Sequence, residues 1–106
     1  MLFKKRFAKL ILEGKKTLEL RRFPPRKKIY SIQVGRYDNI MGYFVVKGYY
    51  TKDVRELTEE EIKRLGFTDR EDLSGFVEEE RLEGEQFLWE IERLPEEEAK
   101  KLVKRR

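Results

Sequence analysis

The stretch from Gly14 to Arg21 constrains the fold more than any other part of this 106-residue sequence. Gly14 follows a segment with helical spacing, and a residue without a Cβ readily takes the left-handed conformation that ends a helix. From Leu18 to Arg21 apolar and charged residues alternate, as in a strand with one buried face. We therefore expect a helix, a turn and a strand, with the two leucines in the core and Glu19 and Arg21 on the other face.

The charged residues of this stretch allow two interpretations. Lys16 leaves the turn at the mouth of the strand, close to Glu19 and Arg21 in the sequence. Opposite charges two residues apart on one strand face often form a solvated pair that adds little stability. The same side chains are also suited to holding a ligand, so a structural and a functional interpretation both stay open.

The chain contains neither cysteine nor histidine. This composition excludes disulfides, thiolate nucleophiles, the usual zinc ligands and the usual general base. Any catalysis has to use Lys, Glu, Asp, Thr, Ser or Tyr. We expect no metal and no cofactor.

Length and hydropathy predict a single domain with one modest core. The longest apolar runs, residues 10–12 and 43–46, are too short for a signal peptide or a membrane span, so we expect a soluble cytoplasmic protein without a membrane partner. Charged residues make up 43% of the chain, a composition typical of hyperthermophile proteins. No sequence feature indicates an oligomeric state.

The charges are segregated along the sequence. Residues 1–36 hold twelve Lys and Arg against two Glu, whereas residues 53–98 hold six against eighteen Asp and Glu. Such asymmetry suggests one surface that faces a polyanion and an acidic surface opposite. The alternative is an ordinary charged surface on which the two halves interleave, or an adaptor that uses the acidic helices between residues 59 and 80.

The remaining elements are predicted from periodicity and turn residues. Strands are expected at 18–21, 29–34, 40–50 and 86–92, and helices near 3–12, 58–66, 68–81 and 96–104. Gly42 and Gly48 inside the long strand mark bends or bulges of a curled sheet. In the last strand we expect Phe87, Trp89 and Ile91 to alternate inward. This order predicts an α+β fold.

Two helix starts carry the same capping signature. Thr58 is followed three residues later by Glu61, and Thr68 by Glu71. In such a capping box the threonine hydroxyl accepts from the backbone of the first turn and the glutamate reaches back. We therefore expect Thr58 and Thr68 as N-caps.

A basic loop and several tyrosines follow the first strand. Residues 23–25, Phe-Pro-Pro, end that strand because prolines cannot donate to the ladder, and residues 26–28 then add three cations as a candidate phosphate contact. Tyrosines are frequent over residues 30–50, and Tyr37 lies at the predicted tip of the turn over residues 35–39. Aromatic rings stack on unpaired bases at about 1–3 kcal/mol per base, so we expect one or two of these rings to be available to a ligand.

The motif residues resemble those of a known family. Gly14, Lys16, Glu19 and Arg21 match the GxKxxExR pattern of the ASCH family, within the PUA-like superfamily, without gap or substitution. The preceding helix, the aromatic and proline break and the order of later elements extend the likeness over roughly residues 3–94. The resemblance implies a small curled β-barrel of about five or six strands flanked by short helices, with a cleft lined by the motif's polar side chains.

The resemblance also implies a ligand, because family members are thought mainly to bind RNA. By that analogy Lys16 and Arg21 meet a phosphate or a base edge, and Glu19 orients Arg21 or accepts a hydrogen bond from a base amine. Further residues would widen the electrostatic footprint or stack on a base: Lys15, Arg22, Arg26, Lys27, Lys28 and Tyr37. The leading hypothesis is a module that binds RNA or a nucleotide-like ligand without turning it over.

A second branch of the family is enzymatic. Some small bacterial members are similar to amidohydrolases that remove an acetyl group from modified cytidine with the motif lysine, a threonine nucleophile and a glutamate. Lys16 matches the lysine, but Glu19 stands at the threonine position, and Thr17 is the nearest hydroxyl on the same predicted strand face. Glu61 is a loose candidate for the glutamate. A ribonuclease, with Lys16 and a Tyr or Glu as acid and base, is a further alternative.

Overall fold

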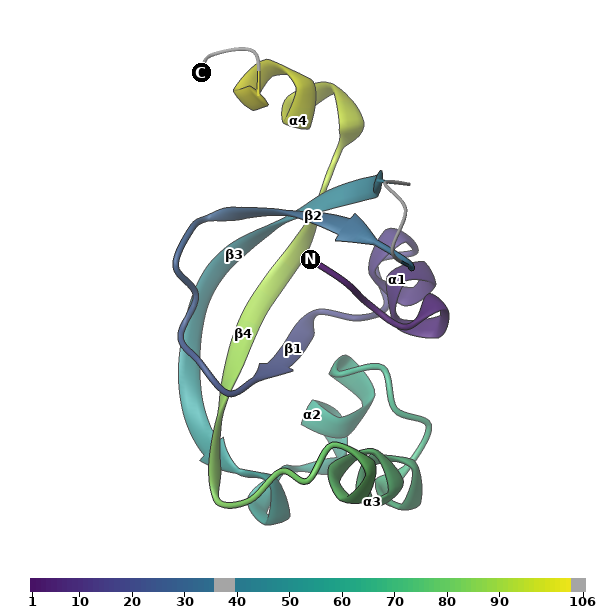
Figure 1. Cartoon of the computed structure of the whole chain (residues 1–106), viewed down its shortest axis with the longest axis vertical. Helices are drawn as coiled ribbons and strands as arrows, with labels where there is room; N and C mark the ends of the chain where they lie inside the picture. Colours follow the sequence, from purple (N-terminus) through teal and green to yellow (C-terminus); the bar gives the residue numbers. More distant parts are fainter. Residues whose placement is uncertain (36–39, 104–106) are drawn as a thin grey trace.

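A computed structural model describes residues 1–35 and 40–103 of the chain. Its strands form one antiparallel sheet in the order β1-β4-β3-β2. The strands are β1 (Leu18–Arg21), β2 (Ile29–Gln33), β3 (Ile40–Asp53) and β4 (Glu85–Leu94). The α+β class and the curled sheet are confirmed, with four strands in the described ranges where five or six were expected. The sheet needs fewer strands because β3 and β4 are long and bend along the molecule (Figure 1).

The two glycines of β3 lie beside irregularities of the strand pairing, as predicted. The register shifts between Val46 and Gly48 against β4, and it shifts again opposite Gly42 against β2. A Cβ on Gly42 would lie 2.8 Å from the Leu12 side chain, so this position lets α1 (Lys5–Leu12) approach the sheet closely. These bulges bend the sheet around the first helix.

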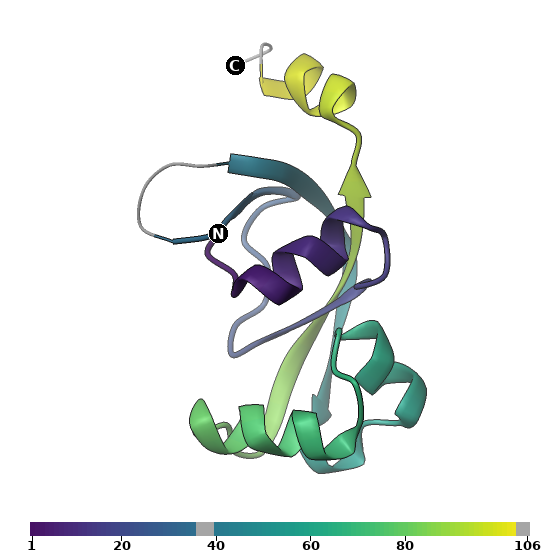
Figure 2. The same cartoon turned by 90° about the vertical axis from the view of Figure 1, so that its right-hand side faces the viewer.

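The helices surround the short strand β1. In Figures 1 and 2, α1 lies on one side of β1, and α2 (Glu59–Arg64) and α3 (Arg70–Glu79) lie on the other. The 3-10 turn η1 (Val54–Glu56) leads into this helical crossover between β3 and β4. The last helix, α4 (Glu96–Val103), lies at the far end of the molecule. The motif strand is therefore enclosed between two helical units.

The two predicted capping boxes have different outcomes. Thr58 Oγ1 accepts from the Glu61 amide at 3.1 Å, and Glu61 Oε1 accepts from the Thr58 amide at 2.9 Å, which confirms the first box. The second prediction is wrong by one residue, because the N-cap of α3 is Asp69, whose carboxylate accepts from the Asp72 amide at 2.9 Å. Asp72 in turn accepts from the Thr68 amide. Aspartate is as good an N-cap residue as threonine, because its carboxylate can also accept from a backbone amide of the first turn. Here Asp69, and not the neighbouring Thr68, occupies the N-cap position.

Both faces of the central strand β4 are buried. Trp89 and Ile91 are buried as predicted, but Leu88, next to Trp89, is fully buried too, and Phe87 is only partly buried. Neighbouring residues of a strand point to opposite faces, so a covered face lies on each side. Both faces are covered because the sheet curls, which brings Tyr30 of β2 against Trp89 with ring centroids 5.2 Å apart, and because α1 packs on β4. The same covering buries Glu19 on β1, where a solvent-facing carboxylate was expected.

Within the described residues, no helix is both long and apolar enough to span a membrane.

Candidate functional site

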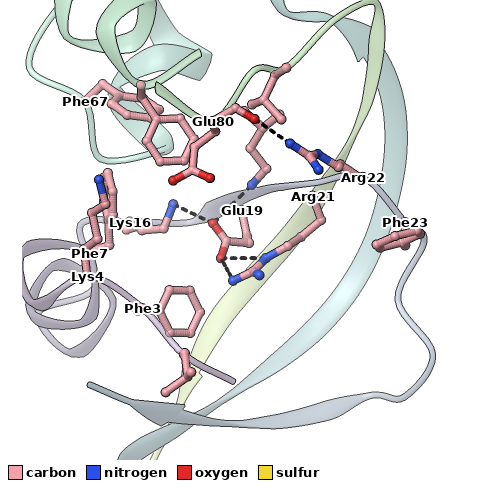
Figure 3. Close-up of a pocket in the computed structure, with 14 residues that line it drawn as sticks. Phe3, Lys4, Phe7, Lys16, Glu19, Arg21, Arg22, Phe23, Phe67 and Glu80 are labelled. Atoms are coloured by element: carbon pink, nitrogen blue, oxygen red, sulfur yellow. Dashed lines mark hydrogen bonds and ion pairs between the residues drawn. The ribbon is translucent and has the colours of Figure 1, made fainter. Parts of the chain in front are cut away.

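A pocket of about 320 Å³ opens beside β1, between α1 and α3. Figure 3 shows the charged side chains of the motif at its base and phenyl rings around them. Lys16 comes from the turn after α1, and Glu19 and Arg21 come from β1 itself. The pocket is lined by Leu2, Phe3, Lys4, Phe7, Lys16, Glu19, Leu20, Arg21, Arg22, Phe23, Phe67, Phe76, Glu80 and Leu82. The structure thus brings the three predicted motif side chains together.

Lys16 is buried, with 3% of its surface exposed. Its Nζ donates to the carbonyls of Leu18 at 2.7 Å and Leu65 at 2.5 Å, and it lies 3.2 Å from Glu19 Oε1. It also lies 5.0 Å from the centroid of the Phe7 ring. Burial lowers the pKa of Lys16, and the Glu19 carboxylate opposes that shift. An ammonium group has three N–H donors, so these three oxygens use all of them and fit the protonated form.

Glu19 links the lysine to the arginine. Its Oε1 accepts from the Leu20 amide at 3.1 Å and contacts Lys16 Nζ, while its Oε2 accepts from Arg21 Nε at 3.2 Å and from the terminal Nη2 at 2.7 Å. Burial raises the pKa of Glu19, but the Lys16 and Arg21 cations outweigh burial, and the pKa stays below its ordinary value. Each carboxylate oxygen already has two partners. The carboxylate therefore positions Arg21 and has little capacity left for a ligand.

Arg21 has N–H donors that are not used by the described residues. Its side chain is 32% exposed at the pocket and lies over the Phe3 ring, 5.4 Å from the centroid. A guanidinium group has five N–H donors, and Glu19 accepts two of them. The other three have no partner in the described part of the chain. Arg21 is therefore the motif residue that can contact a ligand without first breaking the buried cluster.

The rim of the pocket carries charges of both signs. Lys4 pairs with Glu79 at 3.2 Å, and Arg22 donates to the backbone carbonyl of Glu80. The carboxylate of Glu80 points into the pocket above Lys16 (Figure 3). No hydrogen bond or ion pair to this carboxylate occurs in residues 1–35 and 40–103. The rim thus offers a free carboxylate as well as cations.

Thr17 lies outside the pocket, although strand alternation predicted that it would share a face with Glu19. The Thr17 carbonyl still accepts from the Ile91 amide at 3.1 Å, in register with the pairing of β1 and β4, and its amide donates to the Arg64 carbonyl at 2.9 Å. Its hydroxyl accepts from Arg64 Nε at 2.9 Å. Thr17 therefore does not reach the pocket, because Arg64 binds both its backbone amide and its hydroxyl.

Glu61 also lies away from the pocket. Its carboxylate is bonded to Lys52 Nζ and to the Tyr50 hydroxyl, both at 2.7 Å, in addition to the Thr58 amide. None of these four residues lines the pocket beside β1. The location of Glu61 outside the pocket therefore does not support its match to the glutamate of the amidohydrolases.

Of the remaining residues predicted to bind a ligand, only one of those that the structure describes is found in the lining of the pocket. Arg22 lines the pocket, whereas Lys15, Arg26 and Lys28 are exposed and do not line it. Tyr37 lies outside the described residues. The peripheral lysines and arginine can act on a ligand only as part of a wider electrostatic field.

The tyrosine rings placed by the structure do not line this pocket. Tyr30 stacks on Phe44 with centroids 5.5 Å apart and packs against Trp89, and its hydroxyl accepts from the amides of Arg26 and Lys27. This ring joins the core and anchors the basic loop. We expected one or two rings of this region to be available to a ligand. Tyr30 is not available at this pocket, because it packs in the core.

Sequence reasoning missed the aromatic walls and one carboxylate. The helical spacing of Phe3 and Phe7 predicts only an apolar helix face that packs on the core, and Phe67 and Phe76 come from the α2–α3 connection and from α3. Phe3 and Phe7 lie four residues apart, the spacing of one helix face, which was the available signal for a shared wall. No sequence pattern indicated that Glu80 would line the pocket, because its position depends on where α3 ends.

The charge segregation of the sequence is partly cancelled in space. Arg6 of α1 forms a bidentate pair with Asp72 of α3 at 2.9 and 3.0 Å, and Lys4 pairs with Glu79 of the same helix. The acidic crossover therefore neutralises part of the basic first helix. In the described residues no group of three or more His, Cys, Asp or Glu side chains could hold a metal ion.

Solved structures resemble this fold along most of the chain. The ASCH protein of Zymomonas mobilis superposes with a TM-score of 0.67 at 20% identity over 98% of this chain and 92% of its own. A DUF984 protein from Enterococcus faecalis V583 superposes with a TM-score of 0.67 at 12% identity over 84% of this chain and 67% of its own. No family model and no curated protein matches the sequence. The chain has the fold of an ASCH domain, as its motif predicted.

Proposed function

We propose that the chain binds RNA or a nucleotide-like ligand in the pocket beside β1. The observation that carries this proposal is the side chain of Arg21, held by Glu19 with three N–H donors unused inside a pocket walled by phenyl rings. A planar guanidinium recognises phosphates and base edges, and aromatic rings pack against bases. The resemblance of fold to ASCH proteins agrees with this proposal.

The surrounding cations have a supporting role in this proposal. Arg22 and Lys4 lie at the rim. Lys15, Arg26 and Lys28 are exposed outside it and add to the attraction of a polyanion. Contacts of this kind position a nucleic acid and make its binding depend on salt, without reading its sequence.

The composition of the pocket favours binding over hydrolysis. Its lining, within the described residues, contains no Ser, Thr, Tyr, Cys or His. The lysine that would activate a hydroxyl donates to three oxygens, and the nearest candidate nucleophile, Thr17, is bonded to Arg64. A hydroxyl nucleophile needs a base within hydrogen-bond reach, and neither partner meets this requirement here.

The proposal is tested by measuring RNA affinity as a function of salt by fluorescence anisotropy. We expect the logarithm of the affinity to fall linearly with the logarithm of salt concentration. Arg21→Ala should cost about 1–3 kcal/mol of binding free energy. Arg55→Ala is the matched control, because Arg55 is exposed, pairs with Asp53 and does not line the pocket beside β1. Binding that is absent across an RNA panel, or equal in the two variants, contradicts the proposal.

A further inference from the structure

The pocket's charged groups differ in how much hydrogen-bonding capacity they have left. Lys16 uses its three donors on protein oxygens, and each oxygen of Glu19 already has two partners. Within the described residues, the guanidinium of Arg21 keeps three unused donors and the carboxylate of Glu80 has no partner, while Lys4 and Arg22 at the rim each use one donor. A ligand beside the motif strand therefore meets the planar donors of Arg21 and the anionic acceptor of Glu80, with the cations of Lys4 and Arg22 at the rim.

The main chain of Glu80 is held in place at the rim of the pocket, and its side chain is exposed there. Glu80 is the residue that ends α3, and its amide donates to the Phe76 carbonyl at 2.9 Å. Its own carbonyl accepts from Arg22, which follows the motif strand. Two elements on opposite sides of the pocket thus fix the main chain, and the side chain points inward beside Phe67 (Figure 3).

The walls determine the shape of a ligand that fits between these groups. Phe67 contacts Phe7 with centroids 5.3 Å apart and Phe76 with centroids 5.2 Å apart, and Phe3 lies below Arg21. The cavity of about 320 Å³ lies at the lower end of the range of about 300–1,000 Å³ usual for small-molecule sites. A single planar ring system suits such a space, and a base pair or a duplex does not.

Building on the proposed function, we infer that the pocket accepts one unstacked nucleobase with an exocyclic amino group beside an unprotonated ring nitrogen on its Watson–Crick edge, and that Glu80 is the residue that selects it. Adenine and cytosine present an amino donor next to a ring-nitrogen acceptor, which matches a carboxylate beside a guanidinium. Uracil presents a carbonyl oxygen where the amino group would be, and this oxygen is repelled by a carboxylate. Glu80 therefore discriminates, while Arg21 contributes affinity for either class of base.

The test compares short RNA homopolymers of equal length, oligo(A), oligo(C) and oligo(U), in titrations at one salt concentration. Equal length keeps the phosphate contribution the same, so that differences report the base. We expect the wild-type protein to bind oligo(A) and oligo(C) about tenfold more tightly than oligo(U), the effect of one charged hydrogen bond gained or lost. In Glu80→Gln this preference should fall to about twofold or less, because a neutral amide both donates and accepts.

Glu78→Gln is the matched control. It removes the same charge from the same helix, but Glu78 does not line the pocket beside β1, so the preference should persist. Equal wild-type affinity for the three RNAs, or a preference unchanged in Glu80→Gln, overturns this inference and leaves the proposed function standing. Absence of binding to all three RNAs refutes the proposed function, and the inference with it.

Discussion

Two lysine–carboxylate clusters of this molecule contain similar charged groups in different surroundings. In the pocket cluster, Lys16 and Arg21 share the carboxylate of Glu19. In the second cluster, Lys52 and Tyr50 share the carboxylate of Glu61, which also caps α2. Both carboxylates have a pKa below the ordinary value because of the donors around them.

The two clusters differ in how deeply their lysine is buried and in how many hydrogen-bond donors remain unused. The Lys16 ammonium is almost fully enclosed, whereas the side chain of Lys52 is 27% exposed. Only the pocket cluster includes a guanidinium with spare donors facing a cavity, that of Arg21. Uncommitted donors and the adjoining cavity, and not the ion pair itself, therefore distinguish the pocket cluster from the second cluster.

The largest effect should follow from removing the deeper carboxylate. Glu19→Gln leaves the Lys16 ammonium buried without its counter-charge, and breaking a buried pair in this way costs about 3–5 kcal/mol. Urea unfolding monitored by circular dichroism measures the loss. Glu61→Gln is the control and should cost clearly less, because Lys52 can reach solvent. Equal losses in the two variants would remove the distinction between the clusters.

Acid should act on the second cluster within an accessible pH window. Burial raises the pKa of Glu61, but hydrogen bonds from Lys52, Thr58 and Tyr50 outweigh burial and lower the pKa to about 2. A carboxyl whose pKa is lower in the folded state contributes stability that is complete above its unfolded pKa and is lost as pH falls through its folded pKa. We expect up to about 3 kcal/mol to disappear between about pH 4.5 and pH 2.

Urea titrations across this range measure the pH effect, and Glu61→Gln should flatten the curve. The buried Glu19 carboxyl acts in the same direction, so some acid sensitivity should persist in that variant. A variant curve parallel to that of the wild type would show that Glu61 does not contribute in this window.

A smaller effect concerns the coupling within the pocket cluster. Lys16→Met keeps the length of the side chain without its charge, and combined with Glu19→Gln it removes both members of the buried pair. The double variant should be more stable than the sum of the single losses predicts, by about 2 kcal/mol, because neither charge is left uncompensated. Unfolding free energies of the four proteins give this coupling. Additive losses would mean that Lys16 and Glu19 stabilise the fold independently.

The smallest effect should come from the cap of α2. Thr58→Ala removes the hydroxyl that accepts from the Glu61 amide and should cost about 1 kcal/mol of stability. Because neither residue lines the pocket beside β1, RNA affinity at temperatures well below unfolding should stay unchanged. A loss of affinity in this variant would connect the second cluster to the site.

Local rules predicted much of the fold. Gly14 ends the first helix with φ of +76°, β1 covers Leu18–Arg21 as expected, and Thr58 caps α2. These features depend on residues within a few positions of one another, so the sequence contains the information. The capping of α3 by Asp69 shows the limit of such rules where two capping residues are adjacent.

The sequence by itself determined which residues form the site's charged base, because Lys16, Glu19 and Arg21 lie within one turn and one short strand. Only the tertiary structure decided their roles. Burial between α1 and α3 commits Lys16 and Glu19 to each other, leaves donors on Arg21, and brings the phenyl rings and Glu80 from distant segments to the same cavity. The physical reason is that burial and hydrogen-bond capacity depend on neighbours far apart in the chain, and local patterns carry no record of them.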